Sequence, residues 1–192
     1  YIYPKMSLVR FDPINYLQII KKVETLPIML GCMATPTLHL IGIGTGLDAV
    51  DYYGEVHLSY WNSVMHTVGM PFTSYGFVLA IPSLFNLHND TGNYVQKCVF
   101  IVYFIHYLTF DPAIAILFFF FYSFPLYFAM QTYREYPNKR ELLTYGLKTS
   151  FYALFFQEVI GHTVGGDDQS RIEAIPNAIT YAMHYSVSHL IR

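Results

Sequence analysis

Long uncharged stretches separated by short polar breaks dominate the chain after its first fifty residues. No Asp, Glu, Lys or Arg occurs from Ser63 to Leu87. The hydrocarbon core of a bilayer takes about 20 mostly apolar residues of helix, so this stretch is long enough to cross a membrane despite Pro71 and Pro82. It predicts a first membrane helix.

Three further apolar stretches follow. Val99 to Phe110 is short for a crossing unless residues 95–98 extend it, Ala113 to Met130 is a clear candidate, and Leu142 to His162 contains charges only near its two ends. Asp111-Pro112 is a break typical of a tight turn, so we expect the second and third helices to form a hairpin. The pattern predicts an all-α fold, a polytopic membrane helix bundle with about four transmembrane helices.

The first fifty residues follow a different pattern. The stretch from Pro13 to Leu26, "PINYLQIIKKVETL", has apolar residues at helical spacing and a basic flank, which predicts a helix lying at the membrane interface. The stretch from Leu26 to Gly46 is long enough to span a membrane, but Pro, Gly and Thr interrupt it. We therefore expect residues 1–50 to be an N-terminal extension with an amphipathic helix and a possible extra membrane segment, and residues 51–192 to be the main membrane domain.

The composition agrees with a membrane protein. Apolar residues make up 54% of the 192 residues and charged residues 12%, about half the share in a typical soluble protein. A formal net charge of −2 leaves no basic face for phosphates, which excludes a nucleic-acid-binding protein. Cys32 and Cys98 have no metal-binding spacing and form no disulfide framework. The alternative to a membrane protein is a very apolar soluble helical bundle.

An even number of crossings has a consequence for the histidines. His66 lies where the first predicted helix begins and His162 where the fourth ends, so four crossings return both to one membrane face. His57, just before the first helix, lies on that face, and the second helix brings His106 near the same level. His88 falls on the opposite side. Topology alone is expected to gather four candidate metal ligands at one depth: His57, His66, His106 and His162.

The gathered side chains are of the kinds that hold a metal ion. Imidazole is the commonest metal ligand, and two or three imidazoles with a carboxylate form the open site of non-haem Fe(II) enzymes. Glu158 precedes His162 by four residues, so both point along one helix face. A carboxylate in an apolar segment needs a partner, and Glu158 is expected to ligate the metal or to hold a ligand histidine. Asp167 and Asp168 are rival carboxylates, and Asn62 is placed to orient a histidine or a substrate.

Each candidate also has an ordinary structural interpretation. A lone histidine near a helix end is commonly an interfacial polar group, and His106 has tyrosines as ordinary partners on its own helix. Glu158 is able to pair with Lys148 or with a backbone carbonyl of a neighbouring helix. The sequence leaves these alternatives open.

Two motifs carry a resemblance to a known family. The spacing His57-x4-Asn62-x3-His66-x2-Gly69-x-Pro71, followed much later by "QEVIGH" at residues 157–162, resembles the small polytopic membrane proteins that include the yeast-type, iron-dependent 2-hydroxy fatty acid dioxygenases. These enzymes shorten a 2-hydroxy fatty acid by one carbon in α-oxidation. The resemblance covers roughly residues 52–191, so residues 51–192 are expected to form a dioxygenase-like four-helix domain. It implies a membrane-supplied fatty acyl substrate.

The resemblance also assigns roles, and the chain departs from the family's pattern at one of its two motifs. It implies that His57, His66 and His162 hold Fe(II), and it places Glu158 where the family has glutamine. After Gly-His the family shows Phe-Glu and a basic pair, whereas this chain reads "TVGGDDQSRIEAIPNA". Arg171 or Lys148 is a candidate partner for the substrate carboxylate.

The altered second motif favours an alternative function. A family member that has lost its chemistry would serve as an accessory subunit of a large mitochondrial membrane complex, of the respiratory chain or the ATP synthase. The expected location is then the mitochondrial inner membrane. The endoplasmic reticulum is the alternative, because Asn89-Asp90-Thr91 matches a glycosylation sequon.

Overall fold

The computed structural model describes residues 34–38 and 57–167, and all regular secondary structure in these residues is helical. Residues 34–38 form a short helical segment. The others are α4 (Tyr60–Leu84), α5 (Asn89–Phe110), α6 (Pro112–Glu135), α7 (Lys139–Phe155), the π-helix η1 (Phe156–Gly161) and α8 (His162–Gly165). The all-α prediction is confirmed for these residues. The predicted interfacial helix and the domain boundary at residue 50 lie outside the described residues.

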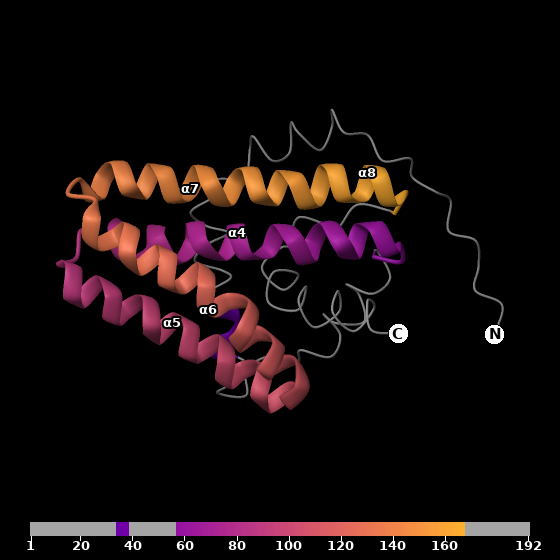
Figure 1. The fold of residues 1–192 in the computed structure, drawn as a ribbon, viewed down its shortest axis with the longest axis horizontal. Helices are drawn as coiled ribbons and strands as arrows, with labels where there is room; N and C mark the ends of the chain where they lie inside the picture. Colours follow the sequence, from indigo (N-terminus) through magenta and orange to yellow (C-terminus); the bar gives the residue numbers. More distant parts are fainter. Residues whose placement is uncertain (1–33, 39–56, 168–192) are drawn as a thin grey trace.

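The start of α6 follows from a capping side chain. Asp111 is the N-cap of α6, where its Oδ1 accepts hydrogen bonds from the backbone N–H groups of Ala113 at 2.9 Å and Ile114 at 3.5 Å. Pro112 occupies the first helical position, where a missing N–H has no cost. The predicted hairpin at Asp111-Pro112 is therefore confirmed, and α5 and α6 pack against each other along it (Figure 1).

The prolines inside α4 are tolerated for an identifiable reason. Pro82 cannot donate to the carbonyl of Val78, one turn earlier, and an unsatisfied carbonyl is costly in an apolar setting. Gln96 of α5 replaces the lost bond, because its Nε2 donates to the Val78 oxygen at 3.2 Å. This repair lets α4 continue as one helix past its second proline.

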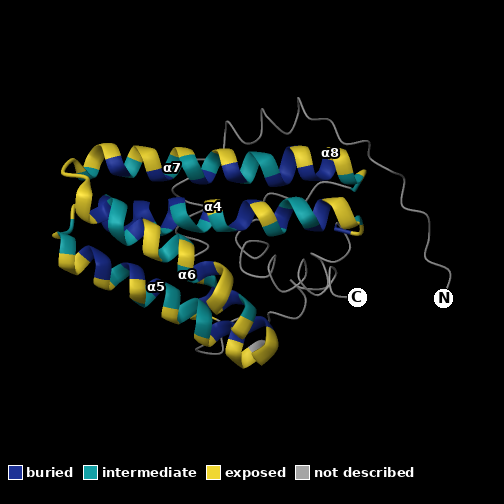
Figure 2. Cartoon of the chain, in the orientation of Figure 1, coloured by how far each residue is buried: buried dark blue, intermediate teal, exposed yellow. Residues whose placement is uncertain are grey.

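The central contact of the fold is the antiparallel pair of α4 and α7. Gly76 and Gly146 face each other so closely that a Cβ on Gly146 would lie 2.7 Å from the Gly76 carbonyl oxygen. Ser150 adds a hydrogen bond from its Oγ to the Thr73 carbonyl at 3.0 Å. Small residues that let two helix backbones approach are typical of membrane helix pairs. In Figure 2 the buried positions of α4 and α7 face each other and the exposed ones of α7 point outward.

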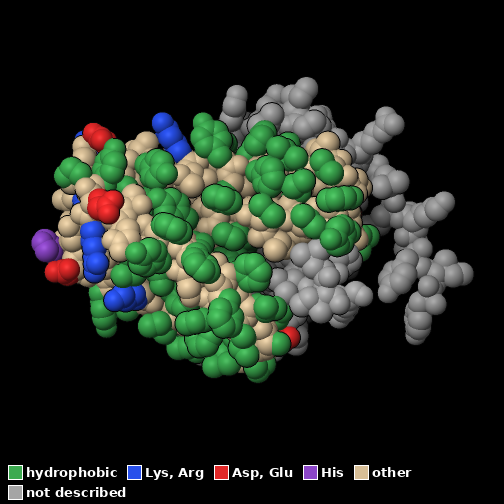
Figure 3. All heavy atoms as spheres, in the orientation of Figure 1, with side chains coloured by type: hydrophobic (Ala, Val, Ile, Leu, Met, Phe, Trp, Pro, Cys, Tyr) green, Lys and Arg blue, Asp and Glu red, His purple; other side chains and the backbone are tan. Residues whose placement is uncertain are grey.

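Two of the described helices, α4 and α6, are long and apolar enough to cross a membrane. Half of the apolar window of α4 is buried inside the protein, but only 28% of that of α6. The exposed side of α6 is rich in aromatic side chains: Phe119, Phe120, Phe121, Phe124, Tyr127 and Phe128. Figure 3 shows hydrophobic side chains over most of the described surface in view, with charged side chains gathered at the end where α6 connects to α7. That distribution fits an apolar belt with a polar end.

Candidate metal centre

Four side chains from two distant parts of the sequence meet at one end of the α4 and α7 pair. His57, His66, Glu158 and His162 each offer one ligand atom, and these four atoms all lie within 4.8 Å of one another. All four residues are buried, with Glu158 the most exposed at 6%. A buried group of three imidazoles and one carboxylate could hold a metal ion.

The antiparallel pairing of two helices produces this group. His66 lies near the start of α4, and the last turns of the helix that runs through α7, η1 and α8 return to the same end (Figure 1). His57 comes from the extended residues just before α4. Gly161 allows the two helices to touch here, because a Cβ on it would lie 2.8 Å from the Asn62 Oδ1. The prediction that chain topology collects His57, His66 and His162 at one level is therefore confirmed.

A change of helix type sets the direction of the ligands. Residues Phe156–Gly161 form a π-helix, and four of them, Gln157, Glu158, Val159 and Gly161, are buried against the rest of the bundle. A π-helical turn contains one more residue than an α-helical turn, so it changes which side chains share a face, and such turns are frequent at functional sites. Here the wider turn presents Glu158 and then His162 toward α4.

The shorter distances between the ligand atoms match those around a metal ion. His57 Nε2 lies within hydrogen-bond distance of His66 Nε2, at 3.1 Å, and Glu158 Oε2 lies 3.5 Å from His162 Nε2. Metal to imidazole bonds of about 2.0–2.1 Å place neighbouring ligand atoms about 3–3.5 Å apart. The longer separations, such as the 4.0 Å between His66 Nε2 and Glu158 Oε1, would have to shorten around one ion.

The three imidazole rings pack edge to face. The ring planes of His57 and His66 make an angle of 79°, those of His57 and His162 71°, and those of His66 and His162 83°. Edge-to-face contact is also an ordinary packing geometry for rings. The feature that fits a common ion is therefore the convergence of one ligand atom from each ring, and not the ring angles.

Several polar atoms around the group lack a hydrogen-bond partner among the described residues. Neither ring nitrogen of His162 makes a hydrogen bond, and the same holds for Ser63 Oγ, Asn62 Oδ1 and Gln157 Oε1. Leaving a buried polar atom unpaired costs about 1–3 kcal/mol. Such atoms gathered at one end of the bundle indicate that a polar ligand or an ion belongs there, so the residues present fit a metal.

Gln157 supports the group although the sequence pattern did not single it out. Its Nε2 donates to Thr73 Oγ1 at 2.8 Å and to the Ala153 carbonyl at 3.0 Å. Its side chain lies next to His66 and against Gly69, where a Cβ would come within 2.7 Å of the Gln157 Cδ. The glycine three residues after His66 was the available signal, because a buried glycine on a helix face indicates a close neighbour.

Asn62 and Asp167 form a separate contact beside the group. Asp167 Oδ2 accepts hydrogen bonds from Asn62 Nδ2 and from the Ser59 backbone N–H, both at 2.9 Å. The helix of Asn62 starts at Tyr60, early enough to place Asn62 on it. Asp167, expected as a rival carboxylate, is not one of the four clustered residues and instead joins the start of α4 to the segment that follows α8. Asp168 lies outside the described residues.

His106 is not part of the group, which corrects its assignment as a ligand. It is buried at 2% exposure on α5, but the clustered ligands come from α4, the residues before it and the α7 to α8 helix. Chain topology predicts the direction in which a helix runs, but it does not predict which neighbouring helices its side chains meet. The hairpin of α5 and α6 packs against α4 and turns away from α8 (Figure 1).

Lys148, one of the two candidate partners for a substrate carboxylate, does not lie at the group. It is exposed on α7, and its position in the helix is about 21 Å along the axis from His162. The other candidate, Arg171, lies outside the described residues.

Comparison of the chain with protein-family models, with curated proteins and with solved structures finds no match. The buried histidines and glutamate are therefore the main structural indication of a function.

Proposed function

We propose that this chain is a membrane-embedded Fe(II)-dependent dioxygenase that shortens 2-hydroxy fatty acids by one carbon. The observation that carries the proposal is the meeting of three imidazoles and one carboxylate at a single buried point. The motif resemblance that includes His57, Asn62, His66 and His162 supplies the substrate class. We propose further that all four long helices cross the membrane, which would put the group at one membrane face.

The donor set suits this metal. Imidazole nitrogen and carboxylate oxygen are ligands that Fe(II) shares with Zn²⁺ and Mn²⁺, and softer thiolate ligands are absent from the group. Four protein ligands leave positions open on an ion that takes six. When bound, Fe(II) would supply the redox chemistry and the Lewis acidity to bring O2 and the 2-hydroxy carboxylate together.

The reaction balances without a further co-reactant. The bond between C1 and C2 of the acid breaks, C1 leaves as CO2, and C2 becomes the carboxyl carbon of the shorter acid. The substrate gives up four electrons, which reduce one O2, and one water is released together with the two products. No external reductant is therefore needed.

The residues of the chain have roles that follow from their contacts. His57, His66 and His162 would hold the ion, and the Glu158 carboxylate would balance part of its charge in a buried setting. Gln157 keeps His66 in place through its bonds to Thr73 and Ala153. The Ser63 hydroxyl, which has no hydrogen-bond partner among the described residues, is able to accept a hydrogen bond from the polar head of a substrate or to donate one to it.

The proposal is tested on protein purified in mild detergent. Elemental analysis would measure bound iron, and mass spectrometry would follow O2-dependent conversion of a 2-hydroxy fatty acid to the acid one carbon shorter. We expect His66→Ala and His162→Ala to abolish both. The matched control is His88→Ala, because His88 is exposed at the opposite end of the bundle. Full turnover in His66→Ala or His162→Ala would overturn the assignment.

The exposed aromatic side of α6 favours a second function, an accessory subunit of a large mitochondrial membrane complex. Only 28% of the apolar window of α6 is buried within the chain, so this side has room for another protein as well as for lipid. Native electrophoresis after mild extraction from mitochondrial inner membrane separates the two. A subunit would migrate with a much larger assembly, whereas a free enzyme would run alone.

A further inference from the structure

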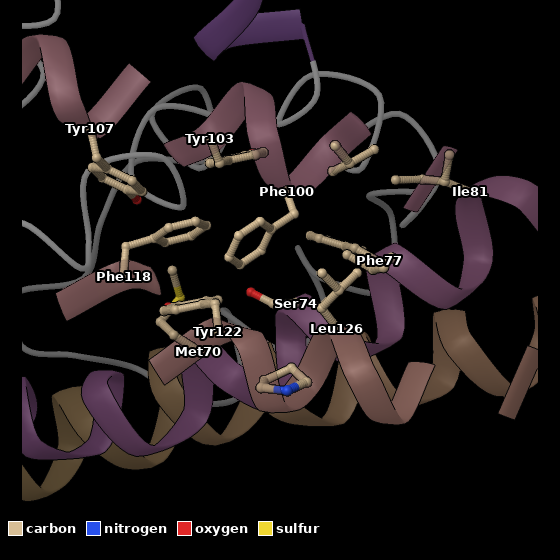
Figure 4. A pocket seen from close by; sticks show the side chains of 13 residues that line it. Met70, Ser74, Phe77, Ile81, Phe100, Tyr103, Tyr107, Phe118, Tyr122 and Leu126 are labelled. Atoms are coloured by element: carbon tan, nitrogen blue, oxygen red, sulfur yellow. The ribbon is translucent and has the colours of Figure 1, made fainter. Parts of the chain in front are cut away.

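A cavity distinct from the histidines and glutamate lies between α4, α5 and α6 (Figure 4). Its lining is aromatic and aliphatic, with Met70, Phe77 and Ile81 from α4 facing Phe100 of α5 and Phe118 and Leu126 of α6. Figure 4 shows the Ser74 hydroxyl pointing into the space between these side chains. The cavity has a volume of about 60 Å³, where about 10–15 Å³ suffices for one water. It is a narrow apolar space rather than a roomy chamber.

The cavity continues the line of His66 along α4. Met70, Phe77 and Ile81 follow His66 by offsets that return to the same helix face, so His66 lies at the head of the stripe that lines the cavity. Met70 is one turn beyond His66, about 6 Å along the axis. A ligand with a polar head at the ion would therefore have its apolar part directed into this space.

The dimensions fit one unbranched hydrocarbon tail. The stripe from Met70 to Ile81 extends about 16 Å along α4, close to the roughly 15 Å that one leaflet contributes to the bilayer core. Two of the three lining helices, α4 and α6, are those able to cross a membrane, so the cavity lies where lipid tails are found. The small volume leaves no room for a fused ring system or for two tails side by side.

We propose that this cavity binds the hydrocarbon tail of a single-chain fatty acid whose head group lies at the His57, His66, Glu158 and His162 group, and that Ser74 and Phe77 set the accepted chain length. The inference rests on the proposed function for the position of the head group. Ser74 lies about 12 Å beyond His66 along α4, so a short tail ends before it and a long tail passes it.

Two substitutions change the cavity in opposite directions. Ser74→Phe fills the middle of the space, and Phe77→Ala enlarges its far part. The matched control is Phe72→Ala, the same change on the same helix at a side chain that is 60% exposed. Each variant is purified in detergent and checked for metal content and thermal midpoint. Binding of the 2-hydroxy derivatives of stearic and capric acid is then measured without oxygen, so that no turnover occurs.

We expect Ser74→Phe to weaken binding of the stearic derivative by about tenfold or more, because excluding as few as two methylene groups already has an effect of that size, with the capric derivative unaffected. Phe77→Ala should shift preference toward longer tails, and Phe72→Ala should change neither. Unaltered binding of the long acid to folded Ser74→Phe, equal weakening of both acids, or displacement by phosphatidylcholine as effective as by the acid would overturn the proposal. Length-dependent binding without O2-dependent shortening would instead support the cavity and refute the dioxygenase.

Discussion

The pair of α4 and α7 and the hairpin of α5 and α6 are held together by different means. In the pair, Gly76, Gly146 and Ser150 bring backbone against backbone with hydrogen bonds across the contact. In the hairpin, aromatic rings fill the space, with Phe118 stacked on Tyr122 at 4.7 Å between ring centroids and close to Tyr107 at 5.0 Å. Backbone contacts fix two helices in register, whereas rings tolerate small shifts. The candidate metal ligands lie at one end of the pair that has the fixed register.

The largest effect is expected where the backbones touch. Gly76→Val places a branched side chain against Gly146 and Ser150, where a Cβ alone would lie 2.5 Å from the Gly146 carbonyl oxygen. The helices must separate, at a cost of about 3 kcal/mol or more, and the ligands on α4 and α8 separate with them. The thermal midpoint of unfolding, measured in detergent, and the metal content of the protein should both fall.

The control for Gly76→Val is Thr144→Val, an exposed position on α7. It should leave the thermal midpoint and metal content close to those of the original chain. Retained metal in Gly76→Val would show that the ligands do not depend on this contact.

A smaller effect is expected in the hairpin. Phe118→Ala removes the ring at the centre of the aromatic cluster, which is 4% exposed. In a soluble core this change costs about 3–5 kcal/mol. On the proposal that the hairpin crosses a membrane, we expect about 2 kcal/mol, because the apolar groups of the unfolded chain would also stay among lipid tails and only packing contacts would be lost. The thermal midpoint should fall while the folded protein keeps its full metal content. Loss of metal would show that the candidate ligands depend on the hairpin as well as on the pair of α4 and α7.

The smallest effect is expected from a neighbour of the ligands. Gln157→Leu keeps the size of a side chain that lies against Gly69 but removes the hydrogen bonds to Thr73 and Ala153. Metal affinity should fall by about tenfold, the usual lower range for a residue that orients a ligand, with little change in the thermal midpoint. Competition with a metal-binding dye measures this directly. Val159→Ala on the same turn, which is buried without such bonds, serves as the control.

The helices and much of the site could be predicted from the sequence for definite reasons. Uncharged length predicts helices, Asp111-Pro112 predicts the hairpin, and an even count of passes predicts that His66 and His162 return to one end. Glu158 is expected beside His162 from its spacing of four residues, and the structure places the two side chains 3.5 Å apart, although the π-helical winding between them is not part of that prediction. These are properties of single helices and of chain order.

The remaining features depend on how helices pack sideways. His106 lies on the hairpin, outside the clustered residues, and nothing in its own segment indicates which helix α5 packs against. The bond from Asn62 to Asp167 joins residues more than a hundred positions apart, and the close approach at Gly76 depends on which glycine meets which. The cavity between α4, α5 and α6 likewise requires three helix faces to be known together.

The π-helix before His162 makes the spacing of the chain as important as its residue types. Loss of a single residue between Phe156 and Gly161 would return the segment to ordinary helical winding and swing every later side chain around the axis. A relative that keeps all three histidines and the glutamate but lacks one residue in this turn would contain the four side chains without bringing them together. Deletion scanning is therefore more informative here than substitution, and gaps in an alignment at this turn should be read as changes in chemistry.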